Sequence, residues 1–181
     1  MSGMDIRKPS SHALHAFDIR PGLRYANLHV HEEVILVLRA HPVTQIPWII
    51  NAVFAFFILF ILNFFLPDFL TVSQIVFLNI FGFVAILSYL WFNFLGWYFN
   101  VGIITNQRVI DVDFHAVIYK EVTETLLSKV EDVTAKSGGF IASLFDFGHV
   151  FVQTAGTEAN IEFFHVPRPS EVTKIINQLL P

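Results

Sequence analysis

The sequence predicts an α+β membrane protein, in which a hairpin of two transmembrane helices precedes an antiparallel β-domain that ends in a helix. Two long stretches carry no charged residue, the region after them alternates apolar and polar residues, and the last residues show helical periodicity. The chain is 54% hydrophobic and 14% charged, with mean hydropathy +0.59 and 21 Phe. Soluble domains carry about 25% charged residues. A chain this short cannot bury so much apolar surface in one core, so lipid is expected to cover part of it.

The first transmembrane helix is expected over residues 46–66. No Asp, Glu, Lys or Arg stands between Ala40 and Pro67, and fifteen of the 21 residues in the span are Ile, Leu, Val or Phe. As a helix the span reaches about 31 Å, which matches the hydrocarbon thickness of a bilayer. Pro47 fits the first turn, where its missing N–H leaves no hydrogen bond unmade.

The second transmembrane helix is expected over residues 75–97, inside a charge-free run, 69–107, that is too long for one span. All 11 Lys and Arg lie outside the connection 67–74. The positive-inside rule therefore places both termini in the cytoplasm. The expected location of the chain is the cell (inner or plasma) membrane. Aromatic residues near the expected cytoplasmic ends agree with an interfacial belt: Trp48, Trp91, Trp97 and Tyr98.

Four asparagines are candidates for polar contacts between the two helices. In an antiparallel pair, Asn51 faces Asn93 and Asn63 faces Asn79. Asn51 and Asn63 are 12 residues apart, about 120° around a straight helix, so they cannot both point squarely at the partner. We predict that Asn51 approaches Asn93. An ion or solute path through such asparagines requires several hairpins, because two helices cannot enclose a pore.

The chain divides into four segments. Residues 1–28 form a polar N-terminal tail, and residues 29–44 form a pre-membrane segment whose apolar part, Val34–Leu38, is expected to be a strand that packs on the later domain. The hairpin covers 45–97. The remaining residues, 98–181, form the β-domain.

Within the β-domain, alternation with a period of two predicts strands around 109–114, 117–122, 150–154 and 160–166. The final segment has apolar residues at helical spacing: Val172, Ile175, Ile176, Leu179 and Leu180. Ser170 is the expected N-cap of this helix, because Pro169 is expected to bar an earlier start. The domain is therefore several antiparallel strands closed by one helix.

Five short motifs occur in order: Thr105-Asn106-Gln107-Arg108-Val109-Ile110, Val130-Glu131-Asp132-Val133, Leu144-Phe145-Asp146-Phe147-Gly148-His149-Val150, Gln153-Thr154-Ala155-Gly156 and Val166-Pro167-Arg168-Pro169. Together they resemble the bacterial PH-like domain family 2, the YdbS-like membrane-anchored PH domain proteins, over residues 97–181. The residues that carry the resemblance are Thr105, Asn106, Arg108, Asp132, Gly148, Thr154, Gly156, Pro167 and Pro169. The resemblance implies a PH-like antiparallel β-sandwich or barrel capped by a helix on a membrane anchor, and it supplies no catalytic residues.

One position departs from the family pattern. Many members have Gly where Asp146 stands. Because Asp tolerates a left-handed backbone less well than Gly, the turn is expected to differ here.

Signals for chemistry are weak. His29 and His31 would share one face of a strand and are the best metal candidates, but no third ligand is evident, and an ordinary polar edge strand explains them as well. The chain has no Cys, which excludes thiol nucleophiles and Cys-based zinc sites. No nucleophile elbow or phosphate-binding loop occurs. We therefore expect neither an enzyme nor a cofactor.

The charge of the chain limits the classes of partner that are expected. A net charge of −4 argues against nucleic acid, and the six Lys and Arg against ten Asp and Glu in 98–181 argue against phosphoinositides. The sequence favours a membrane-anchored cytoplasmic interaction or scaffolding unit that binds a protein segment or its own copies. The alternatives are a component of an oligomeric transport or channel assembly, and a metal-binding protein through His29 and His31.

Overall fold

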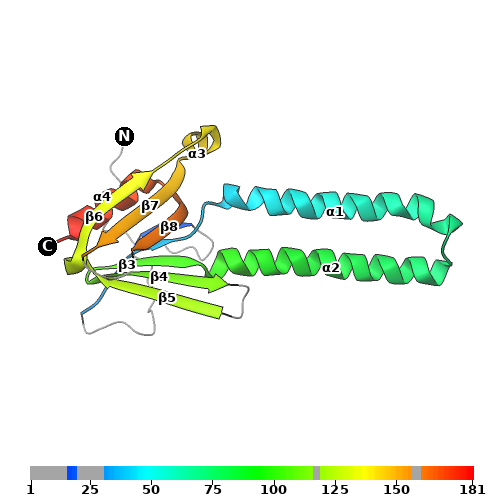
Figure 1. Ribbon diagram of the computed structural model, residues 1–181, viewed down its shortest axis with the longest axis horizontal. Helices are drawn as coiled ribbons and strands as arrows, with labels where there is room; N and C mark the ends of the chain where they lie inside the picture. The colour runs from blue at the N-terminus through cyan, green and yellow to red at the C-terminus, as the bar shows by residue number, and fades with distance from the viewer. Residues whose placement is uncertain (1–15, 20–30, 116–118, 156–159) are drawn as a thin grey trace.

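The computed structural model describes residues 16–19, 31–115, 119–155 and 160–181. These residues form a β-domain from which a long hairpin of two antiparallel helices projects (Figure 1). Helix α1 is Ile46–Phe65 and helix α2 is Val72–Phe99. Both are long and apolar enough to cross a membrane. The predicted spans are therefore confirmed as helices, the second being longer at both ends than the sequence indicated.

The ends of the hairpin helices follow from local chemistry. A short 3₁₀ turn, Pro42–Gln45, leads into α1, which has Pro47 in its first turn. Pro67 has no N–H to continue α1, and a second 3₁₀ turn, Leu66–Asp68, follows. At the start of α2 the Thr71 N–H donates to Gln74 Oε1 at 2.9 Å. Beyond α2 the chain becomes extended at Asn100 and passes directly into a strand.

The β-domain contains two antiparallel sheets. The first has the order β1–β2–β3–β4–β5, made of Phe17–Ile19, Val34–Leu38, Val101–Thr105, Arg108–His115 and Tyr119–Leu126. The second has the order β6–β7–β8, made of Val130–Lys136, Phe147–Thr154 and Ile161–Pro167. A 3₁₀ turn, Leu127–Lys129, joins the sheets, helix α3 (Phe140–Phe145) lies between β6 and β7, and helix α4 (Pro169–Leu179) ends the chain.

The predicted strand Val34–Leu38 is confirmed as β2. It pairs with β3, the strand that follows the hairpin, in the register Leu36↔Ile104 and Leu38↔Gly102. All five β2 residues are buried, which explains why the strand is continuously apolar rather than alternating. The segment before the hairpin and the segment after it therefore form one folding unit.

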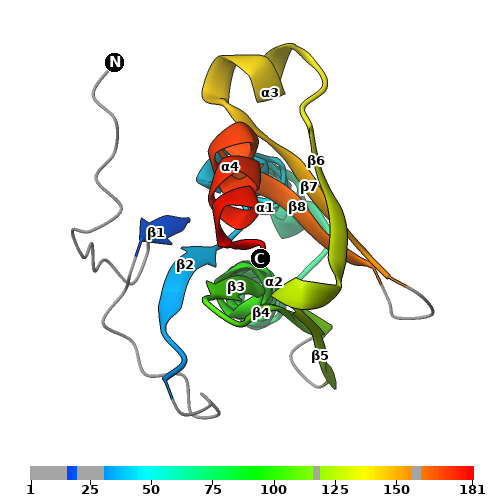
Figure 2. The ribbon, with the colours of Figure 1, turned by 90° about the vertical axis from the view of Figure 1, so that its left-hand side faces the viewer.

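The main core lies between the sheets and under α4, which contacts β6 and β7. Figure 2 shows α4 beside the second sheet, viewed from the end opposite the hairpin. Fully buried residues come from β2, β3, β4, β7, β8 and α4: Leu36, Leu38, Ile104, Val109, Val150, Val152, Ile161, Val172 and Ile176. Gly102 makes room for the Phe163 ring, because a Cβ there would lie 2.5 Å from Phe163 Cε1. We attribute the closeness of β3 and β8 at this point to that glycine.

Two local predictions were wrong. Helix α4 begins at Pro169 rather than after a Ser170 N-cap, because Arg168 is the N-cap in a left-handed conformation (φ 49°) and proline fits the first helical position. Asp146 was expected to alter its turn, yet it adopts the left-handed conformation (φ 50°) as the C-cap of α3. Asp is one of the few non-glycine residues that visits this region. The Asp146 carbonyl accepts a hydrogen bond from the Arg168 N–H at 2.8 Å.

Candidate functional site

The first motif closes the β3–β4 turn and holds the segment that precedes β2. Thr105 Oγ1 accepts from the Arg108 N–H at 2.9 Å and donates to the Arg108 carbonyl at 3.0 Å. Asn106 Oδ1 accepts from the Glu33 N–H at 2.9 Å, and Asn106 Nδ2 donates to the His31 carbonyl at 3.0 Å. The asparagine amide therefore extends the β2–β3 pairing beyond the end of the strands.

Arg108 lies at the centre of a buried ion-pair cluster. Its Nε donates to Glu32 Oε1 at 2.9 Å and its Nη2 donates to Glu32 Oε2 at 3.1 Å, in a two-pronged pair. Arg108 Nη1 also pairs with Glu124 of β5. The Glu32 hydrogen bond and the nearby carboxylates raise the pKa of Arg108, although burial opposes them. Because the guanidinium joins three separate segments, it fixes the edge of the first sheet to the pre-membrane segment.

The remaining motif residues have local structural roles. A Cβ on Gly148 would lie 2.6 Å from the Lys136 carbonyl, so the β6–β7 approach requires glycine there. Pro167 ends β8, and Pro169 opens α4. Asp132 is exposed and accepts from Thr134 Oγ1 at 2.8 Å.

The motif Gln153-Thr154-Ala155-Gly156 extends beyond the end of β7. Thr154 is buried at the end of β7, where its N–H donates to Asn160 Oδ1 at 3.2 Å. Gly156 lies outside the described residues. The motif residues that the structure describes therefore support the sheets, and they do not converge on one pocket.

The interhelical asparagines pair at the end of the hairpin far from the β-domain. Asn63 Nδ2 donates to Asn79 Oδ1 at 2.9 Å, and Asn79 Nδ2 donates to Asn63 Oδ1 at 2.7 Å. The predicted pairing of Asn51 with Asn93 was wrong: Asn93 Nδ2 donates instead to the Tyr89 carbonyl at 2.8 Å. A helix that points Asn63 at its partner turns Asn51, about 120° away, to the outside.

This pair leads to a prediction about the hairpin. Replacing both asparagines, in the variant Asn63→Leu/Asn79→Leu, should cost less stability than the sum of the two single replacements, because each single change leaves an amide without its partner. A coupling energy of about 0.6 kcal/mol is expected. A double-mutant cycle on unfolding in mixed micelles measures it, and strictly additive effects would contradict the pairing.

The metal candidates do not form a site in the described part of the chain. His29 lies outside the described residues. His31 is exposed, with a positive φ of 67°, and its carbonyl accepts the Asn106 amide. Across residues 16–19, 31–115, 119–155 and 160–181, no group of three potential ligands is placed to hold a metal.

The junction between hairpin and domain is tied by hydrogen bonds from three directions. The His41 N–H donates to the His165 carbonyl at 2.7 Å, Trp97 Nε1 donates to the Ala40 carbonyl at 2.7 Å, and Arg39 Nε donates to the Tyr98 carbonyl at 3.1 Å. His165 has a positive φ of 55° at an irregularity in the β7–β8 pairing, which turns its carbonyl toward the linker. The linker 39–41 is therefore held against both the end of α2 and β8.

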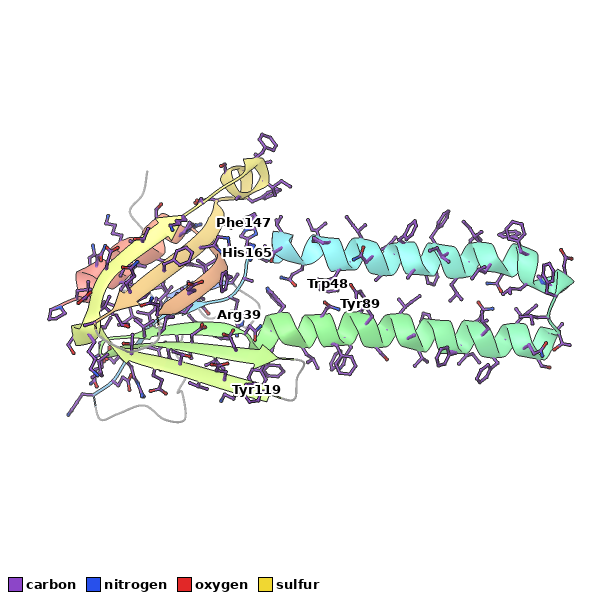
Figure 3. The ribbon with its side chains drawn as sticks, in the orientation of Figure 1. Arg39, Trp48, Tyr89, Tyr119, Phe147 and His165 are labelled. Atoms are coloured by element: carbon purple, nitrogen blue, oxygen red, sulfur yellow. The ribbon has the colours of Figure 1, made fainter. Side chains whose placement is uncertain are left out.

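A hollow of about 670 Å³ opens beside this junction, between α3 and the start of α1. Its lining is mostly apolar and includes Ile46, Pro47, Phe140, Ile141 and Phe145. At its inner side the His41 ring stacks on Phe147 with centroids 5.5 Å apart, and the His149 and His165 rings meet at 4.6 Å. Figure 3 places Phe147 and His165 where the domain meets the hairpin. Burial lowers the pKa of His41 and of His165, so both favour the neutral form.

A smaller cavity of about 150 Å³ lies between β3, β4 and β8, with Asp111, Asp113 and Glu162 in its lining. Burial and the nearby Asp113 carboxylate raise the pKa of Asp111 to about 7, from an ordinary value of 3.8. Between these two pH values the folded chain binds a proton at Asp111 that the unfolded chain has lost. The contribution of Asp111 to stability therefore falls as pH rises from about 4 to about 7.

Replacing the Asp111 carboxyl tests this dependence of stability on pH. The variant Asp111→Asn should gain stability over the parent chain at pH 7 and above, and the difference should vanish near pH 4. Thermal unfolding of both chains across this pH range measures it. Asp132→Asn, which makes the same replacement at an exposed position, is the matched control. Parallel pH profiles for Asp111→Asn and the parent would contradict the assignment.

Sequence reasoning missed two groups of residues. Glu32 and Glu124 were not identified as partners of Arg108, although an arginine inside an apolar hairpin motif requires an acid nearby. Of the exposed apolar side chains of α3, Leu144 and Phe145 were interpreted only as part of a motif, and Phe140 and Ile141 were not singled out. Their spacing, with Phe140 and Leu144 four residues apart, is a helical signal that the sequence already carried.

Comparison with known protein families places the chain in context. A family model described as a bacterial PH domain matches residues 44–180. The match begins at Thr44, so it includes both hairpin helices as well as the later strands and α4, whereas the motifs alone indicated residues 97–181. No curated protein and no solved structure matches the chain.

Proposed function

The chain belongs to the bacterial PH domain family, and we propose that it is a membrane-anchored, non-enzymatic interaction module. In this proposal α1 and α2 span the bilayer, and the β-domain lies on the cytoplasmic side. The domain binds a protein segment or a second copy of the chain. The observation that carries the proposal is the exposure of the hairpin, whose large apolar side chains are mostly left uncovered by the described part of the chain.

The anchor is supported by what surrounds the two helices. Most of their phenylalanines are exposed, and Phe77 is 71% exposed. Ala52 is the buried residue of α1, and α2 has none. In water this surface would be strongly unfavourable, while a bilayer core solvates it. The absence of charge over both helices agrees with the same medium.

The cytoplasmic orientation is supported by the distribution of bases. The connection between the helices contains Asp68 and no Lys or Arg, while Arg39 and Arg108 belong to the β-domain end. Trp48 in the first turns of α1 and Trp97 in the last turn of α2 lie at the level where an interface would run. Strand β1, the first described element, and helix α4 both belong to the β-domain end of the molecule (Figure 1).

An open sheet edge supports the interaction role. Strand β5 pairs with β4 through all eight residues, and no strand of the described chain pairs with its other side. Such an edge offers main-chain N–H and C=O groups to an added strand. Tyr119 and Val122 are exposed along it and provide side-chain contacts. We propose β5 as the docking strand.

The transport alternative has little to support it. Its polar pathway would depend on the asparagines, but Asn63 and Asn79 bind one another, and each also donates to a carbonyl of its own helix. Phosphoinositide recognition also has little support, because Arg108, the base in the first motif, is engaged by two glutamates.

The docking strand can be tested by site-specific photocrosslinking in cells that express the full-length chain. A photoreactive phenylalanine analogue at Tyr119 or Val122 should give a discrete adduct of fixed mass, either twice the chain or the chain plus one partner. The same analogue at Lys174, which is exposed on α4, is the control. Absence of adducts at both β5 positions, or the same adduct at Lys174, would reject β5 as the docking strand.

A further inference from the structure

Helix α3 has a surface unlike the rest of the β-domain. Four of its six residues are large and apolar and face outward, with Phe140 81% exposed and Leu144 64% exposed. No charged residue occurs from Ser137 to Phe145. A group of exposed apolar side chains on one short element marks a contact surface.

The position of α3 relates this surface to the hairpin. One wall of the 670 Å³ hollow is α3 and the other is the first turn of α1, represented by Ile46 and Pro47. Figure 1 shows α3 projecting from the domain toward the side where α1 begins. The exposed face of α3 is thus continuous with the exposed apolar surface of α1.

From this continuity we infer that α3 is an interfacial membrane element, which inserts its apolar side chains among the upper acyl chains of the leaflet that the hairpin crosses. The inference rests on the proposed membrane anchor. The ligand is the phospholipid bilayer itself, and acyl chains fill the hollow between α3 and α1. The apolar face of an interfacial helix is buried about 5–10 Å into the boundary between headgroups and acyl chains, and its binding strength scales with the buried apolar area.

The absence of cysteine makes this inference testable in the full-length chain. Three single-cysteine variants, Ile141→Cys on α3, Phe57→Cys in α1 and Lys174→Cys on α4, each carry one environment-sensitive fluorophore. The labelled proteins are reconstituted in vesicles of phosphatidylcholine and phosphatidylglycerol. Quenching is measured with a lipid that bears a nitroxide near the top of its acyl chain and, separately, with aqueous iodide.

The inference predicts that the label at Ile141 emits at shorter wavelength than the label at Lys174 and is quenched several-fold more strongly by the nitroxide lipid. A label at Ile141 that iodide quenches as strongly as at Lys174 would overturn it. So would a label at Ile141 that is shielded from both quenchers, because a second protein then covers α3. The label at position 57 distinguishes failure of the membrane anchor from failure of the α3 inference. If iodide quenches the label at position 141 but not the label at position 57, the anchor stands and only the α3 inference fails.

Discussion

Replacing Arg108 with methionine is expected to lower the free energy of unfolding by about 3–5 kcal/mol, because the change leaves a buried carboxylate without its cation. The Glu32 side chain is fully shielded from solvent, and Arg108 is 7% exposed. Methionine keeps much of the apolar volume of arginine, so the loss reports the charge rather than a cavity. Denaturant unfolding of the full chain in detergent micelles, followed by the β-sheet signal, measures the effect.

Two further variants separate the buried pair from the surface pair. Glu124→Gln removes the outer partner, whose side chain is 38% exposed, and should cost about 1 kcal/mol or less. The double variant Arg108→Met/Glu32→Leu should recover much of the loss, since apolar replacement of a buried ion pair is often neutral. If Arg108→Met costs no more than Glu124→Gln, the buried pair does not hold the pre-membrane segment in place.

The second large effect is expected in the hairpin. Phe56 lies near the middle of α1 with half of its surface exposed. Aspartate at the centre of a spanning helix costs about 2.5–3.5 kcal/mol, and the favourable contribution of the phenylalanine is lost as well. Phe56→Asp should therefore reduce the membrane-integrated fraction by more than about tenfold.

Alkaline extraction of membranes from expressing cells measures that fraction. Phe56→Leu is the matched control, and it should insert like the parent chain because leucine is equally favourable on the same scale. If α1 instead packed against protein, aspartate at position 56 would be equally unfavourable. Alkaline treatment would then extract both the parent chain and Phe56→Leu from the membranes. Full extraction of the parent chain and of Phe56→Leu would therefore contradict a lipid environment around α1.

The hairpin and the strand β2 could be predicted from the sequence because their signals are local. A charge-free run of about 20 apolar residues has few structural solutions, and the shortness and β-branched residues of the run Val34–Leu38 favour a buried strand. The alternation around Asp111 and Asp113 likewise predicted β4. These patterns depend on neighbouring residues alone.

The contacts around Arg108 could not be predicted in the same way. Glu32 is 76 residues away in sequence, and its carboxylate meets the guanidinium only because β2 pairs with β3 across the hairpin. A motif match identified Arg108 as important without indicating its partner. The sequence alone therefore did not identify Glu32 as the partner of Arg108.

The asparagine pairing shows a different limit. The antiparallel register allowed both Asn51–Asn93 and Asn63–Asn79, and periodicity excluded only their simultaneous formation. The choice depends on the rotation of the two helices about their axes, which packing over the whole hairpin decides. Leu59 against Gly82 is one such contact, in which a Cβ on the glycine would lie 3.0 Å from the leucine side chain.

The predicted start of α4 was wrong for a local reason. Proline was treated as a barrier to the helix, whereas Pro169 occupies the first helical position, where no N–H is required. The left-handed Arg168 that precedes it is not evident from residue type, because arginine rarely adopts that conformation. The hydrogen bond from the Arg168 N–H to the Asp146 carbonyl helps to hold the left-handed conformation.

The topology of the hairpin tests the central claim most directly. Ser73 is exposed at the start of α2, at the end of the hairpin remote from the β-domain, and Lys174 is exposed on α4. In intact cells, a membrane-impermeant maleimide should label Ser73→Cys from outside the membrane and should label Lys174→Cys only after the cells are opened. Labelling of Ser73→Cys only after opening, or of both variants in intact cells, would contradict a spanning hairpin with a cytoplasmic domain.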